Sequence, residues 1–112
     1  MIVREDQQDE VVILELEGKI TIGEGDVILR EAIGKYLHQE QICILLNMAR
    51  ITYMDSSGIG ELLSCFKEVS RHGGNLKLLN ISTRIKDLLQ ITQLLSVFEY
   101  FDDKEKAVAS FQ

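Results

Sequence analysis

The sequence predicts an α/β protein with a mixed, mostly parallel sheet of about four to five strands, packed with about four helices. Runs typical of strands alternate with runs of helical spacing, in the order β-β-α-β-α-β-α-β-α. One strand, Gln41 to Asn47, is almost wholly apolar, as expected where helices cover both faces. Because each crossover helix returns the chain beside the preceding strand in the same direction, most neighbouring strands are expected to be parallel.

The first part of the chain predicts two paired strands and a helix. Val11 to Glu17 is rich in β-branched residues and ends at Gly18. We expect Ile2 to Arg4 to pair with this strand across a polar turn, Asp6 to Glu10. After Gly25, apolar residues recur at helical spacing and predict a helix. These residues are Val27, Ile28, Ala32, Ile33, Tyr36 and Leu37.

The remaining elements follow the strand Gln41 to Asn47. A loop carrying Tyr53 and Met54 is expected next, followed by the turn Asp55-Ser56-Ser57-Gly58. Helical spacing after the turn predicts a second helix, which Gly73-Gly74 ends. The last predicted elements are a strand over Asn75 to Asn80, a helix marked by Ile85, Leu88, Leu89 and Leu94, a short strand over Val97 to Phe101 and a helix over Asp103 to Phe111.

Length and composition limit the classes of protein. We expect residues 1–112 to form a single domain, since two cores in this length would each bury too little apolar surface. The net charge of −6 disfavours direct binding to nucleic acid or to anionic lipid. No apolar run approaches the roughly 20 residues of a membrane helix, and the N-terminus lacks a signal-peptide core. We therefore expect a cytoplasmic protein without a membrane partner.

The turn Asp55-Ser56-Ser57-Gly58 is the predicted functional centre. In open sheets of this type, sites collect in loops that follow the carboxyl ends of strands, and Lys19 to Gly25 is a second such loop. Asp and Ser are good N-caps, but Gly58 and Gly60 each cost about 0.5 to 1 kcal/mol relative to alanine within a helix. The bare backbone indicates close approach by a partner, with Met54 and Ile59 as apolar contacts.

The segments Tyr53 to Gly60 and Gly73 to Leu78 resemble the STAS domain of bacterial anti-sigma factor antagonists, and the resemblance spans essentially the whole chain. It implies a partner-switching cycle. The unphosphorylated protein would bind an anti-sigma factor that is also its serine kinase, phosphorylation would break this complex, and a serine phosphatase would restore it. The implied acceptor is Ser56, with Ser57 as the less favoured acceptor and mainly a capping or supporting residue. The implied partner-binding residues are Met54, Asp55, Ser56, Ser57, Gly58, Ile59, Gly60 and Thr21.

One position departs from the family pattern. Where the family usually carries an acidic residue shortly after the equivalent of Gly18, this chain has Thr21. The spacing Thr21-Ile22-Gly23-Glu24 predicts a capping box at the start of the first helix. The substitution motivates an alternative function, a STAS scaffold that is not phosphorylated and serves as a subunit of a larger signalling or lipid-transport assembly. Binding or hydrolysis of a nucleotide in the loops is a third hypothesis.

Other constellations point away from an enzyme. A nucleophilic Ser56 would need a histidine base and an oxyanion hole, and its turn is not a Gly-x-Ser-x-Gly elbow. Gly23-Glu24-Gly25 lacks the third glycine of a dinucleotide fingerprint. Cys43 and Cys65 form no close pair and sit inside apolar segments, so we expect free, buried thiols. We expect no cofactor and no metal, and a monomer or weak dimer.

Overall fold

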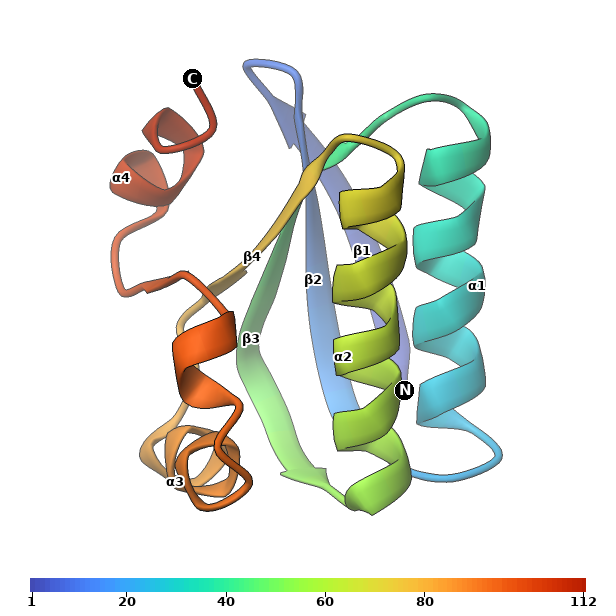
Figure 1. Cartoon of the computed structure of the whole chain (residues 1–112), viewed down its shortest axis with the longest axis vertical. Helices are drawn as coiled ribbons and strands as arrows, with labels where there is room; N and C mark the ends of the chain where they lie inside the picture. The colour runs from blue at the N-terminus through green and yellow to red at the C-terminus, as the bar shows by residue number, and fades with distance from the viewer.

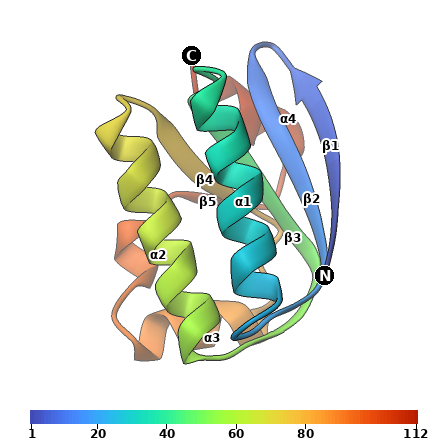
Figure 2. The ribbon, with the colours of Figure 1, turned by 90° about the vertical axis from the view of Figure 1, so that its right-hand side faces the viewer.

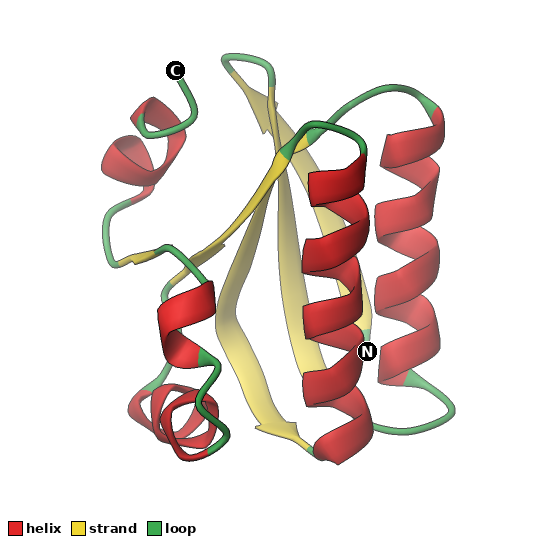
Figure 3. Cartoon of the chain, viewed as in Figure 1, coloured by secondary structure: helices red, strands yellow, loops and turns green.

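The computed structural model describes all 112 residues and has the predicted order of elements. The strands are β1 (Ile2–Gln8), β2 (Val11–Ile20), β3 (Cys43–Met54), β4 (Asn75–Leu79) and β5 (Tyr100–Phe101). The helices are α1 (Gly25–His38), α2 (Ser56–Arg71), α3 (Thr83–Ile91) and α4 (Lys104–Ala109), with a short 3-10 helix η1 (Leu95–Val97). Figure 3 shows how strands and helices alternate along the chain.

The strands form one sheet in the order β1-β2-β3-β4-β5. β1 runs antiparallel to β2, and the other neighbours are parallel. Helices α1 and α2 lie side by side against one face of the sheet, and α4 lies on the other (Figures 1 and 2). The mixed, mostly parallel sheet predicted from the crossover helices is therefore confirmed.

The central strands are buried on both faces, as their apolar sequences predict. Along β2, Val12 and Leu14 belong to the main core beneath α1 and α2, whereas Val11 and Ile13 join a second cluster with residues of α4. Successive side chains of a strand point to opposite faces, so an unbroken apolar run supplies both cores.

Two predicted boundaries in the first hairpin are wrong. β1 continues to Gln8, and the turn consists only of Asp9 and Glu10, which have φ values of 50° and 68°. Two consecutive residues in the left-handed region make a tight turn that matches the twist of the strands, so the polar residues before them remain paired. β2 also does not end at Gly18 but continues to Ile20.

The loop predicted to carry Tyr53 and Met54 is instead the end of β3. The pairing with β2 shifts register twice, between Glu15 and Glu17 and between Gly18 and Lys19. Each shift inserts one extra residue into β3 and breaks the period of two that identifies strands in a sequence. Because the alternation is broken after Asn47, the sequence does not show that β3 continues to Met54.

The buried face of α1 differs slightly from the prediction. Leu29 is fully buried, whereas Val27 and Ile28 are half-buried. The face that packs on the sheet starts at Gly25, which lies against the carbonyl group of Lys19. Leu29 and Ile33, four and eight positions after Gly25, share that face.

The C-terminal part contains a further correction. The predicted strand Val97 to Phe101 is reduced to β5, because residues before it form η1 and fold back over the main core. Phe98 is 4% exposed and packs edge-to-face on Phe66 of α2, with 5.2 Å between ring centroids. Leu94 lies beyond the end of α3. None of the helices combines the length and apolar character needed to cross a membrane.

Candidate functional site

The two loops predicted to hold the site meet at one end of the sheet. β2 and β3 finish side by side, with Ile20 opposite Met54. The chain then enters residues 21–24 after β2 and Asp55 after β3, and Figure 1 shows that α1 and α2 both start at this end. The parallel order of the strands therefore places these loops together, as the sequence predicted.

Asp55 joins the two loops through both oxygens of its carboxylate. Oδ1 accepts a hydrogen bond from the backbone N–H of Gly58 at 2.8 Å and so caps α2. Oδ2 accepts one from the backbone N–H of Ile22 at 3.0 Å. These hydrogen bonds, the one from Ile22 foremost, lower the pKa of Asp55 below its ordinary value. The ionised carboxylate thus ties the loop after β2 to the first turn of α2.

Gly58 is required by the packing of the protein itself. A Cβ atom at this position would overlap the carbonyl oxygen of Ile20. The same carbonyl oxygen accepts a hydrogen bond from the backbone N–H of Asp55 at 3.4 Å. Gly60 differs, because a Cβ atom there would have no neighbour within 4 Å. We expected both glycines to let a partner approach the backbone closely, but Gly58 is explained by packing within the protein. Only Gly60 has open space where a side chain would be.

The two serines of the turn occupy different environments. Ser56 is the first residue of α2 and is exposed, whereas Ser57 is half-buried. The expected capping role of Ser57 is wrong, because the side chain that caps α2 belongs to Asp55. Ser56 is thus the more exposed of the two residues.

The apolar residues at the site also differ from the expected ones. The side chain of Met54 is 2% exposed and belongs to the main core, so it is not available as the apolar contact that we expected. Ile59 is half-buried and packs against the same core. The large apolar side chains that do reach the surface beside the turn are Ile22, which is 72% exposed, and Tyr53.

Ile22 was overlooked because its segment was interpreted as a capping box. That interpretation is wrong, since α1 starts at Gly25 and its N-cap, Glu24, forms no side-chain hydrogen bond. The positive φ of Gly23, 82°, interrupts the helical path that a capping box needs. Thr21 is half-buried and supports α1 through its backbone carbonyl, which accepts a hydrogen bond from Asp26 N–H at 3.1 Å.

The groups between α1 and α2 have structural partners. Arg30 of α1 forms an ion pair with Glu61 of α2 at 3.1 Å. Cys65 lies beneath this pair as a free, buried thiol, and Cys43 is also free. Burial raises the pKa of Cys65, and the Glu61 carboxylate raises it further. Both thiols are free, but only Cys65 is buried as expected, since Cys43 is half-buried.

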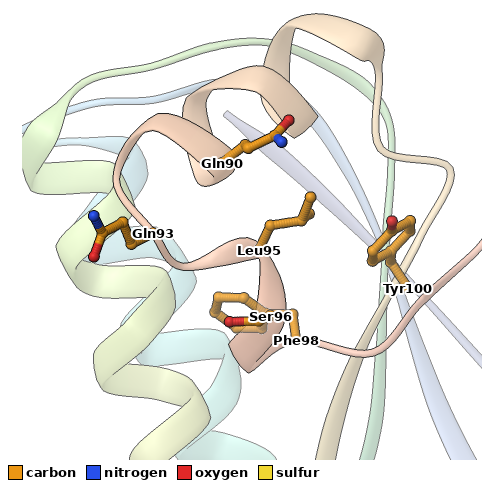
Figure 4. Close-up of a pocket in the computed structure, with 6 residues that line it drawn as sticks. All are labelled: Gln90, Gln93, Leu95, Ser96, Phe98 and Tyr100. Carbon is orange, nitrogen blue, oxygen red and sulfur yellow. The ribbon is translucent and has the colours of Figure 1, made fainter.

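A separate hollow of about 490 Å³ lies where α3, η1 and β5 meet (Figure 4). Its lining residues are Gln90, Gln93, Leu95, Ser96, Phe98 and Tyr100. None of these residues is Asp, Glu, His, Lys or Arg. The serine turn does not contribute to this hollow, so the two regions are distinct.

Comparison with known proteins agrees with the fold. The model of the STAS domain family matches residues 3–107. The anti-sigma-B factor antagonist of Bacillus subtilis is 28% identical over 102 residues, which are 91% of this chain and 92% of that protein.

Two solved structures show the same arrangement of elements. Protein TM1081 of Thermotoga maritima superposes with a TM-score of 0.89 at 21% identity, covering 97% of this chain and 93% of the other. The phosphorylated form of SpoIIAA from Bacillus superposes with a TM-score of 0.75 at 24% identity, covering 99% and 100%. With the family model matched over nearly the whole sequence, this chain belongs to the STAS domain family.

Proposed function

We propose that this protein is an anti-sigma factor antagonist switched by phosphorylation of Ser56. In the unphosphorylated form it binds an anti-sigma factor that is also a serine kinase, and phosphorylation releases it. The observation that carries the proposal is the exposed Ser56 at the start of α2, directly after the aspartate that joins two loops at one end of the sheet. The relative from Bacillus subtilis, an anti-sigma-B factor antagonist, supports the same role.

The position of Ser56 suits a switch that acts on binding and leaves the fold intact. Ser56 is exposed, so a phosphate on this residue needs no space inside the core. The positive end of the α2 dipole favours an anion at this point. The phosphate adds about −1.5 to −2 charges beside the ionised Asp55, which disrupts an interface packed against the turn.

The protein acts in this cycle as a substrate and binding partner and not as an enzyme. The kinase supplies the groups that position ATP and metal, so Ser56 needs no base of its own. A serine phosphatase restores the hydroxyl group and allows the complex to form again. We assign the cycle to the cytoplasm, where bacterial transcription takes place.

Phosphorylation in vitro tests the proposal directly. The protein is incubated with candidate anti-sigma kinases and ATP, and phosphosites are mapped by mass spectrometry. Ser56→Ala is expected to abolish modification while keeping affinity, and the matched variant Ser57→Ala to keep both. Ser56→Asp is expected to weaken the complex. Absence of phosphate at both serines, with a stoichiometric complex that ATP leaves intact, would favour the scaffold function motivated by Thr21.

A further inference from the structure

We propose that Ile22 is a specificity-determining contact for the kinase that modifies Ser56, and that Asp55 is the positioning residue that holds Ile22 in place. The inference rests on the proposed function, because it names how that kinase recognises this chain. The partner is a protein surface that presents an apolar pocket for Ile22 beside the cleft that receives Ser56.

Ile22 is exposed yet lies in a well-anchored loop. Its side chain is 72% exposed and therefore contributes little to the core. The loop around it is attached at three points: Ile22 N–H to Asp55 Oδ2 at 3.0 Å, Asp26 N–H to the Thr21 carbonyl at 3.1 Å, and Gly25 packed against Lys19. An apolar side chain held in a fixed position loses little freedom when a partner covers it.

The carboxylate of Asp55 places Ile22 next to the acceptor. One oxygen holds the first turn of α2, which begins with Ser56, and the other holds the backbone of Ile22. A kinase must bring its cleft to the Ser56 hydroxyl group and therefore covers the surface on either side of this carboxylate.

Charge near the site adds to the description of the partner. Asp55 is ionised, and Glu24, which lies 3.7 Å from the N-terminal ammonium of Met1, carries a carboxylate that is 75% exposed. The chain as a whole has a net charge of −6. We therefore expect basic residues at the rim of the apolar pocket, since opposite charges favour encounter and orientation of the two surfaces.

The test compares Ile22→Gln with Ile91→Gln. Both residues are exposed apolar side chains, at 72% and 79%, but Ile91 ends α3 and belongs to neither loop of the site. Ile22→Gln is expected to raise KM for phosphorylation about tenfold or more with little change in kcat, because burial of one apolar side chain is lost. Ile91→Gln is expected to leave KM unchanged.

Asp55→Asn tests the positioning role. Asparagine is a good N-cap, but its amide offers one acceptor oxygen where the carboxylate offers two. The variant therefore cannot hold both Gly58 N–H and Ile22 N–H. We expect KM to rise, and we expect the rise to be smaller when Ile22 is already glutamine, because both changes remove the same contact. Additive effects of the two substitutions would overturn the positioning role.

The outcomes separate this inference from the proposed function. A wild-type protein that no kinase binds or modifies would overturn both. A wild-type protein that is modified at Ser56 while Ile22→Gln keeps the wild-type KM would overturn the inference alone, as would equal losses in Ile22→Gln and Ile91→Gln. Self-association that Ile22→Gln abolishes in the absence of kinase, with KM unchanged, would identify a second copy of this chain as the occupant and likewise overturn it.

Discussion

Replacing Gly58 with alanine is expected to destabilise the protein, although alanine favours helices over glycine. The added Cβ atom would overlap the carbonyl oxygen of Ile20 at the end of β2. A backbone carbonyl cannot rotate away as a side chain does, so the start of α2 or the end of β2 has to move. That movement also disturbs the hydrogen bond between Asp55 N–H and the same carbonyl.

The expected magnitude follows from two opposing effects. Overpacking costs about 1 to 3 kcal/mol, whereas the change from glycine to alanine within a helix gains about 0.5 to 1 kcal/mol. The net loss in free energy of unfolding for Gly58→Ala is therefore about 1 kcal/mol at the middle of these ranges and at most about 2.5 kcal/mol. In a domain of this size, each kcal/mol lowers Tm by roughly 4 °C.

Gly60→Ala is the matched control, because it makes the same chemical change two residues later in the same helix. A Cβ atom at Gly60 has no neighbour within 4 Å, so only the gain in helix propensity remains, about 0.5 to 1 kcal/mol. Urea and thermal unfolding followed by circular dichroism measure both variants. Equal stability of the two would refute the assignment of Gly58 to internal packing. Lower partner affinity in the stable Gly60→Ala variant would indicate that a partner approaches this backbone.

Three further predictions concern ionisable groups. The pKa of Asp55 is lowered in the folded protein, so the ionised carboxylate contributes its full stability above its ordinary pKa of 3.8. That contribution is lost as pH falls through the lower pKa of the folded state. The free energy of unfolding of Asp55→Asn, measured in urea, is therefore expected to vary less with pH in acid than that of the wild type. Burial raises the pKa of Cys65 and so keeps it as the unreactive thiol. A colorimetric thiol assay at neutral pH is therefore expected to detect Cys43 first and Cys65 only after denaturation. Rapid reaction of both thiols in the folded protein would contradict this. Lys77 is 6% exposed, donates to the carbonyl and hydroxyl oxygens of Ser110 and forms an ion pair with Glu99 at 2.9 Å. Lys77→Met is therefore expected to cost about 1 to 3 kcal/mol in urea unfolding and to speed amide exchange in α4, whereas wild-type stability would show that these contacts together contribute nothing.

Patterns within short stretches of the sequence were enough to predict the order of the helices and strands and the type of most of them. The period of apolar residues in α1 and α2, the apolar run of β3 and the glycines after α2 all act over a few residues, and the parallel connection rules then arrange the strands. The wrongly predicted boundaries are those of elements whose ends are set by contacts with residues distant in the sequence. Leu94 to Phe98 packs back on the core through Phe98 and so forms little strand.

The location of the candidate site was also accessible from the sequence, because a polar, glycine-containing turn after an apolar strand lies at the carboxyl edge of a parallel sheet. The roles within the turn were not. Asp55 was expected to be a helix-start residue, and it is, but its second hydrogen bond goes to Ile22, 33 positions earlier in the chain. Contacts of such separation leave no periodic signal in a sequence.

The sequence by itself determined that this chain forms a mixed α/β sheet, that its serine turn lies at the carboxyl edge, and that the turn resembles that of STAS domains. Only the tertiary structure decided that Gly58 serves packing against Ile20, that Met54 is buried, and that Asp55 binds the backbone of Ile22. The physical reason is that amino-acid type controls local geometry and burial on average, whereas the use of an individual backbone or side chain depends on atoms that folding brings from distant positions.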